Sequence, residues 1–166
     1  KSGSFDLIEA LGIKIDISAA KIAEAIETIG LGFLFARSHH PAMRFVAPVR
    51  AELGVRTVFN LLGPLTNPAF AKLNLIGVSN AALLEPFARV LHSLGSQRAV
   101  VVHGTMGDEP IDELALGENQ IAELNQGQVK TYSLTPEEVG LSSASYKAIE
   151  GSNAAENAVV ARAILS

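Results

Sequence analysis

Four carboxylates lie close together directly after a continuous apolar run at 99–102. They are Asp108, Glu109, Asp112 and Glu113. Such a run is typical of a strand buried on both faces, and open α/β sheets bind ligands at the carboxyl ends of these strands. Clustered carboxylates there can hold Mg²⁺ together with substrate phosphates. A solvated acidic loop is the alternative, and spacing alone does not decide between the two.

A second group of residues suited to chemistry begins at His39. It contains two adjacent histidines and three arginines spaced six residues apart, namely His39, His40, Arg44, Arg50 and Arg56. An arginine can grip a carboxylate or phosphate through two parallel hydrogen bonds. Because a six-residue spacing does not place side chains on one helix face, the three need not act together, and surface arginines are the alternative.

The residues Lys1–Ser4 precede a predicted helix and form a third, less specific candidate. Hydroxyls, backbone N–H groups and the positive end of a helix dipole together suit an anion such as phosphate. Many capped helices share these features.

The elements that position these groups follow from apolar spacing. The first half of the chain predicts a helix from Ser2 or Ser4 to Gly12, a helix at 19–29 capped by Ser18, and a short buried strand at 32–36. Two short helices are expected between residues 41 and 53, interrupted at Pro48, then a helical turn at 56–62 and a rigid turn at 63–68.

The second half predicts a strand, helix, strand unit at 73–78, 81–94 and 99–102, with parallel strands and Asn80 as the helix cap. A hairpin around 125–128 is expected at the sheet edge. A capping box at 135–138 predicts a short helix, and Asn153 begins a last one. This is an α/β pattern.

Composition excludes several classes of protein. The chain has 166 residues, 48% of them apolar and 18% charged, so it can form a packed core. The net charge of −4 argues against non-specific nucleic-acid binding. No cysteine is present, which excludes disulfides and thiolate chemistry and is compatible with the cytoplasm. No leader or membrane-spanning segment is expected, and P-loop, dinucleotide-binding, zincin and hydrolase motifs do not occur.

The assembled motifs are more specific than any one cluster. The strings at 1–12 (KSGSFDLIEALG), 32–36 (GFLFA), 40–44 (HPAMR) and 53–68 (LGVRTVFNLLGPLTNP), with VVHG at 101–104 and IDEL at 111–114, closely resemble the anthranilate phosphoribosyltransferases of tryptophan biosynthesis. Their order and spacing agree with that family, and the resemblance spans essentially the whole chain.

The resemblance implies a transfer of phosphoribosyl from phosphoribosyl pyrophosphate to anthranilate, with release of pyrophosphate and with Mg²⁺ as cofactor. It implies a small helical domain beside a larger α/β domain with a mainly parallel sheet, as a cytoplasmic homodimer without nucleic-acid or membrane partners. Arg50 would pair with the anthranilate carboxylate, with His40, Asn60 and Pro64 around the ring. The remaining implied site residues are Ser4 for phosphoribosyl pyrophosphate and Asp112 with Glu113 for the metal.

Two departures from the family pattern qualify this expectation. Six residues, 105–110, separate His103-Gly104 from Ile111, so the sequence has two Asp-Glu pairs; flanking apolar residues favour 112–113, and Asp108-Glu109 stays open. The family's GTGGD loop and KHGN segment occur nowhere in these 166 residues. We therefore expect an internal or C-terminal fragment that is inactive alone, with α/β segments at 1–38 and 67–166 and a helical segment at 39–66.

Two other functions are consistent with parts of the sequence. A pyrimidine nucleoside phosphorylase shares the architecture but would not be expected to carry the HPAM and GPLTNP strings. A non-catalytic, nucleic-acid-binding paralogue is disfavoured by the negative charge and by retention of Arg50 with the acidic pair.

Overall fold

The computed structural model describes residues 2–35, 39, 45–46, 48–49, 52, 54–55, 57–106 and 109–166, with the side chain of Glu109 left undescribed. Contacts divide the chain into two units, Lys1–Thr57 with Glu150–Ser166, and Val58–Ile149. The predicted helices between 41 and 53 lie mostly outside the described residues. The predicted division at 38 and 66 stays a prediction.

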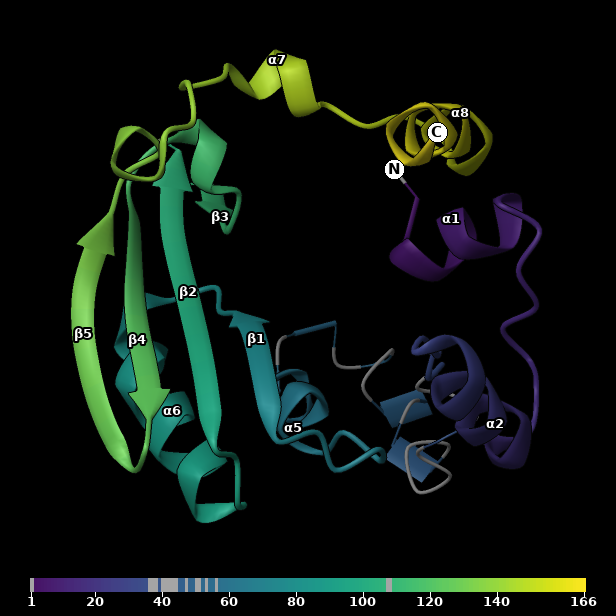
Figure 1. Ribbon diagram of the computed structural model, residues 1–166, viewed down its shortest axis with the longest axis horizontal. Coiled ribbons are helices and arrows are strands. Elements are labelled where there is room, and N and C mark those ends of the chain that lie inside the picture. Colours follow the sequence, from purple (N-terminus) through teal and green to yellow (C-terminus); the bar gives the residue numbers. More distant parts are fainter. Residues whose placement is uncertain are drawn as a thin grey trace. The chain divides into compact units, whose positions relative to one another are not determined.

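The unit Val58–Ile149 is built on a five-stranded sheet (Figure 1). Its strands are β1 (Leu73–Gly77), β2 (Arg98–Met106), β3 (Glu109–Ile111), β4 (Asn119–Asn125) and β5 (Gln128–Leu134). The order is β1-β2-β4-β5, and β3 pairs with the far end of β2.

The sheet is mixed. Strands β1 and β2 are parallel, as predicted, whereas β2–β3, β2–β4 and β4–β5 are antiparallel. The α/β class is confirmed. The sheet was expected to be mainly parallel, but among the described strand pairs only β1–β2 is parallel. The physical reason is the short connections after β2, because parallel neighbours need a crossover of a dozen or more residues.

One face of this sheet is covered by a helix. The short 3-10 helix η1 (Ala81–Leu83) leads into α6 (Leu84–Ser93), and the Asn80 side chain accepts a hydrogen bond from Ala82 N at 2.9 Å, which confirms the predicted cap. The buried face of α6 packs on the sheet. Together they form the core of the unit, which comprises Ile76, Val78, Leu84, Phe87, Ala88, Leu91, Ala99, Val101, Ala122 and Leu124.

The segment before the sheet forms a helix where a turn was predicted. Helix α5 (Phe59–Leu65) includes Gly63 and Pro64, so the prediction of a turn across 63–68 was wrong for its first three residues. Leu61 and Leu65 pack against the core and stabilise this helix despite Pro64, which lacks an N–H donor. The helix ends at Leu65, and the hydroxyl of the C-cap residue Thr66 donates to Leu62 O at 3.0 Å.

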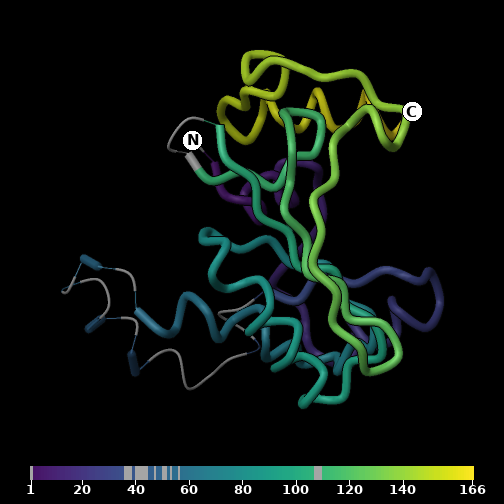
Figure 2. Tube along the Cα trace, turned by 90° about the vertical axis from the view of Figure 1, so that its left-hand side faces the viewer, coloured from purple at the N-terminus to yellow at the C-terminus, as the bar shows by residue number. Residues whose placement is uncertain are grey.

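The predicted hairpin is confirmed at the sheet edge. Gln126 and Gly127 connect β4 and β5 with φ angles of 49° and 79°, and the two strands run side by side as one long hairpin in the Cα trace (Figure 2). Three short helices complete the unit, η2 (Leu114–Leu116), η3 (Glu137–Val139) and α7 (Tyr146–Ile149). Half of the predicted capping box is present, since Thr135 N donates to Glu138 Oε2 at 2.7 Å. The other half is not formed, because the N-cap of η3 is Pro136 and no side chain caps it.

The other unit contains three described helices, α1 (Ser4–Ala10), α2 (Ala19–Ile29) and α8 (Ala154–Leu165). Ser18 caps α2 and Asn153 caps α8, as predicted. Arg162 of α8 donates to the carbonyl oxygens of Ala10 and Leu11 at 3.4 and 3.2 Å, and so satisfies the C-terminal end of α1.

The predicted strand at 32–36 was wrong over its described part. Residues 31–35 form neither helix nor strand, and residue 36 lies outside the described residues. None of the described strands pairs with this segment, so its backbone has no ladder to join. Its apolar side chains still pack, because the Phe5 and Phe35 rings lie 4.8 Å apart between centroids.

Within the described ranges, every helix is too short or too polar to cross a bilayer.

Candidate functional site

The acidic pair lies at the carboxyl end of β1. Strand β3 runs antiparallel to β2 with Ile111 opposite Gly104, so residue 112 leaves the sheet near the place where β1 ends. The Asp112 side chain then lies directly over Gly77, the last residue of β1. This is the edge at which open α/β sheets bind ligands. The sequence placed the carboxylates at the end of the strand at 99–102, whereas the structure places Asp112 at the end of the neighbouring parallel strand β1.

Both carboxylates of the pair are exposed and uncompensated. Glu113 Oε2 accepts a hydrogen bond from Asp112 N at 3.2 Å, which ties the two residues together. In the described part of the chain, neither carboxylate has an ion-pair partner. Two adjacent carboxylates that no described lysine or arginine neutralises form a donor set that suits a divalent metal.

Magnesium fits this donor set better than a metal that needs a complete protein cage. Among the residues with described side chains, no cluster of three or more His, Asp and Glu could hold a metal ion. Mg²⁺ is commonly bound by one or two carboxylates while substrate phosphates and water complete its octahedron. Asp112 and Glu113 would therefore supply only part of the coordination of Mg²⁺, with water or a phosphorylated ligand completing it.

The other acidic pair lies farther along the β2–β3 hairpin. Glu109 pairs with Met106, two register positions beyond the Gly104 and Ile111 pair, and Asp108 lies outside the described residues. Since β1 ends opposite Val102, residue 109 lies at the far end of the hairpin from β1. This register favours the pair at 112–113.

Two of the implied anthranilate residues lie on one face of α5. Asn60 and Pro64 are four residues apart, so they share a helix face, and both are exposed. The neighbouring face carries Leu61 and Leu65, which pack on the core. The helix is therefore fixed in a way that leaves the Asn60 and Pro64 face accessible.

The structure does not place the remaining predicted site residues relative to Asp112, Glu113, Asn60 and Pro64. Arg50 and His40 lie outside the described residues. Ser4 is exposed at the first turn of α1, in the other unit. At that helix start, the cap is Gly3, not Ser2 or Ser4, and Asp6 Oδ2 accepts from Gly3 N at 2.7 Å, so a carboxylate already uses one of the N–H groups that an anion would need.

Two residues near the acidic pair were not assigned a role from the sequence. Buried His103 lies on β2, and its Nδ1 is 2.8 Å from Val78 O; because a carbonyl oxygen only accepts, Nδ1 carries the hydrogen. Gly77 lies beneath Asp112. The signal for Gly77 was available, since a glycine inside an apolar strand often marks a close approach.

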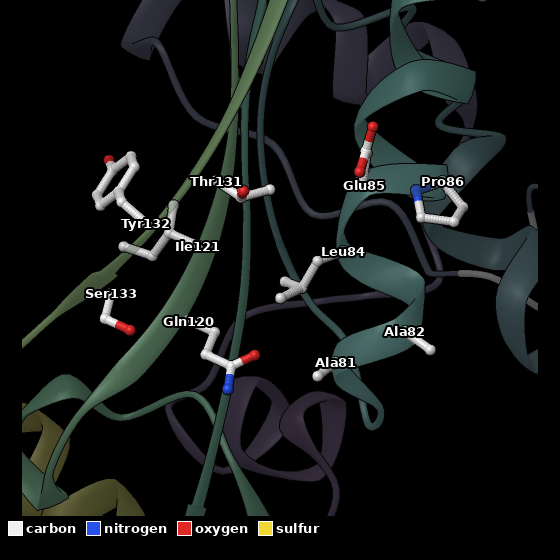
Figure 3. A pocket seen from close by; sticks show the side chains of 10 residues that line it. All are labelled: Ala81, Ala82, Leu84, Glu85, Pro86, Gln120, Ile121, Thr131, Tyr132 and Ser133. Atoms are coloured by element: carbon white, nitrogen blue, oxygen red, sulfur yellow. The ribbon is translucent and has the colours of Figure 1, made fainter.

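The hollow drawn in Figure 3 is a separate feature of the same unit. It has a volume of about 600 Å³ and lies between the start of α6, where Leu84 and Glu85 line it, and strands β4 and β5, where Gln120 and Tyr132 line it. None of the predicted site residues that the structure describes lines this hollow. Beside it, burial and the nearby Glu123 carboxylate raise the pKa of Tyr132.

Comparisons with known proteins identify the family of the chain. A family model described as "Glycosyl transferase family, a/b domain" matches residues 1–166. The chain belongs to this glycosyl transferase family. The α/β fold of the chain agrees with the description of this family.

Individual relatives narrow the resemblance. The chain is 54% identical over 165 residues to anthranilate phosphoribosyltransferase of Thermus thermophilus and 49% identical to that of Azorhizobium caulinodans, with 99% of the chain covered in each case. It spans about half the length of these curated relatives, 48% and 47% respectively. The family resemblance inferred from the motifs is confirmed.

Solved structures give the same result. The crystal structure of the Thermus thermophilus enzyme matches 99% of this chain and 48% of that one, with a TM-score of 0.89 and 55% identity. The Saccharomyces cerevisiae enzyme in complex with PRPP and Mg matches 95% of this chain and 44% of that one, with a TM-score of 0.83 and 27% identity. Another yeast structure contains 4-fluoroanthranilate, with a TM-score of 0.81.

Proposed function

We propose that this chain supplies the metal-binding acidic pair and the anthranilate-binding residues of an anthranilate phosphoribosyltransferase. The reaction transfers phosphoribosyl from phosphoribosyl pyrophosphate to the amine of anthranilate and releases pyrophosphate. The observation that carries the proposal is the Asp112 and Glu113 pair at the carboxyl end of β1, in a chain 54% identical to an enzyme of that name.

The acidic pair would act on the leaving group. Breaking the bond between the sugar and pyrophosphate develops positive charge on the sugar and negative charge on the departing diphosphate. Mg²⁺, when bound, would neutralise part of that negative charge. Asp112 and Glu113 contribute by holding their two carboxylates side by side and uncompensated, which sets the position of a cation at this edge of the sheet.

The acceptor side needs positioning more than acid or base chemistry. The amine of anthranilate is neutral at pH 7 and already exposes a lone pair. Arg50 would orient it by gripping the carboxylate through two hydrogen bonds, with His40, Asn60 and Pro64 forming the walls of the ring pocket. The shared face of Asn60 and Pro64 on α5 supports this part of the proposal.

The finer assignments rest on the resemblance. Ser4 is proposed for phosphoribosyl pyrophosphate, and a homodimer and a cytoplasmic location are proposed for the protein. Light scattering of the purified protein at several concentrations tests the dimer.

A hybrid enzyme tests the function directly. In it, this chain replaces the 165-residue segment of the Thermus thermophilus relative to which it is 54% identical. The expected result is Mg²⁺-dependent consumption of anthranilate, followed by its fluorescence, only when phosphoribosyl pyrophosphate is present. Phosphorolysis of pyrimidine nucleosides by the same hybrid, without anthranilate turnover, would instead favour the nucleoside phosphorylase. A folded hybrid with neither activity would contradict the proposal.

A further inference from the structure

Gly77 occupies a position where its own backbone does not require glycine. It is the last residue of β1, in the sequence LNLIG, and its φ is not in the left-handed region. Glycine destabilises a strand because it has no side chain to pack and because its flexible backbone loses more conformational entropy on folding. Because the backbone conformation does not require glycine here, we infer that there is no room for a side chain at position 77.

The space above Gly77 is filled by Asp112. A methyl group at position 77 would overlap Asp112 Oδ2 and would lie 3.1 Å from its Cγ and 3.3 Å from its Cβ. The overlap with Oδ2 is far closer than a van der Waals contact, and the crowding extends along the whole side chain. Turning the carboxyl group alone would therefore not make room for a larger residue.

Both backbone polar groups of Val78, the residue after Gly77, are hydrogen-bonded to β2. Val78 N donates to Val102 O at 2.9 Å, and Val78 O accepts from the buried ring of His103 at 2.8 Å. Because these bonds tie the end of β1 to β2, a side chain at position 77 would displace Asp112 more readily than the strand.

We propose that Gly77 is a positioning residue for metal binding, because its bare backbone gives the Asp112 carboxylate its place at the end of β1. The inference rests on the proposed role of Asp112 in holding Mg²⁺. Mg²⁺ demands near-ideal octahedral geometry with short metal–oxygen distances, so a carboxylate pushed aside by a methyl group is a poorer ligand. His103 supports the same arrangement by fixing Val78 O.

Magnesium titrations of the 166-residue chain, followed by the backbone amide signals of residues 77, 112 and 113, test this inference. Gly77→Ala should weaken Mg²⁺ binding by about tenfold, the lower end of what supporting residues around metal ligands contribute. Asp112→Ala should weaken it at least as much, and Gly77→Ala combined with Asp112→Ala should be no worse than Asp112→Ala alone. The control is Leu75→Ala, on the same strand and the same face, where the side chain is 76% exposed.

The outcomes distinguish the positioning role of Gly77 from the metal-binding role of Asp112. If Asp112→Ala weakens binding and Gly77→Ala does not, the positioning role is wrong and the metal role of Asp112 stands. If Asp112→Ala leaves binding unchanged, the metal role itself fails.

Thermal unfolding in EDTA supplies a second readout. Gly77→Ala should lower the unfolding temperature in the wild-type background and have little effect in the Asp112→Ala background, where the crowded atoms are gone. An equal loss in both backgrounds would overturn the proposal, because glycine would then be needed for the strand and not for the carboxylate. If Gly77→Ala alone does not fold, recovery of folding in the double variant supports the proposal, and failure of both contradicts it.

Discussion

The sequence left open which of the two acidic pairs binds the metal, and the register of the short strand β3 favours Asp112 and Glu113. Ile111 faces Gly104, which brings Asp112 back to β1, whereas Glu109 faces Met106 farther out on the hairpin. We therefore expect Asp112→Ala to weaken Mg²⁺ binding about tenfold and Glu109→Ala to change it less than twofold, by isothermal titration of each variant. A larger loss in Glu109→Ala than in Asp112→Ala would transfer the metal site to the other pair.

Arg50 offers a test of the acceptor side. Lysine keeps the positive charge but loses the planar fork that pairs with a carboxylate through two hydrogen bonds. In the hybrid enzyme, Arg50→Lys should raise the KM for anthranilate about tenfold, equivalent to the ~1.4 kcal/mol of one charge-assisted hydrogen bond, and leave the KM for phosphoribosyl pyrophosphate within twofold. Arg89→Lys, at an exposed side chain of α6, is the matched control, and an equal effect there would count against a role for Arg50.

Glu137 carries a residue-scale prediction that is independent of function. The Ser143 hydroxyl donates to Glu137 Oε1 at 2.6 Å and, as the largest cause, holds the pKa of this carboxyl below its ordinary value. Because the folded pKa is lowered, the stabilisation is present above the ordinary carboxyl pKa and is lost as pH falls through the folded value. Ser143→Ala should raise the pKa of Glu137, measured by carbon NMR, and Ser142→Ala should not. An unchanged pKa in Ser143→Ala would show that another contact is responsible.

At the scale of elements, the β4–β5 hairpin depends on a turn that is not optimal. Gln126 adopts a φ of 49° and Gly127 a φ of 79°, the pattern of a two-residue turn with both central residues left-handed. Asparagine tolerates this conformation better than glutamine, so Gln126→Asn should stabilise the chain by roughly 0.5 kcal/mol in urea unfolding. Gly127→Ala should destabilise it by about 1 kcal/mol. A destabilising Gln126→Asn would contradict this account of the turn.

Sequence signals that act over a few residues predicted three helix caps and the β4–β5 hairpin correctly. Ser18, Asn80 and Asn153 were identified as caps because an N-cap needs only a side-chain oxygen near the next backbone N–H groups, and the structure confirms all three. The hairpin was found because its turn residues lie between two apolar runs.

Some elements that depend on distant partners were not predicted. The run at 32–36 has strand-like composition, but a strand needs a neighbour, and none of the described strands pairs with it. Pro64 and Gly63 indicated a turn, yet contacts of Leu61 and Leu65 with the core favour a helix there. The place of Asp112 over Gly77 was likewise invisible, because 35 positions separate the two residues along the chain.

For the whole molecule, the central prediction is that the guanidinium of Arg50 and the carboxylates of Asp112 and Glu113 face one cleft. The acidic pair belongs to the unit Val58–Ile149, and Arg50 lies outside the described residues, so this juxtaposition stays a prediction. The sequence supports it only through the family resemblance, since no spacing rule relates residues in separate units.

The last prediction concerns which segments of the proposed enzyme bind pyrophosphate. The 166 residues contain neither the GTGGD loop, which the resemblance places around pyrophosphate, nor the KHGN segment, and they span about half the length of the relatives. Backbone N–H groups of a glycine-rich loop are the natural complement to a metal on a diphosphate, because each neutralises part of the charge that develops as the bond breaks. The 166-residue chain alone should therefore give no detectable turnover of anthranilate, whereas the hybrid with the Thermus thermophilus relative should be active. Single-turnover measurements with enzyme in excess over phosphoribosyl pyrophosphate detect even a very slow reaction. Full activity of the isolated chain would show that the acidic pair and the residues around anthranilate suffice for catalysis, and would refute the assignment of pyrophosphate binding to segments that this sequence does not contain.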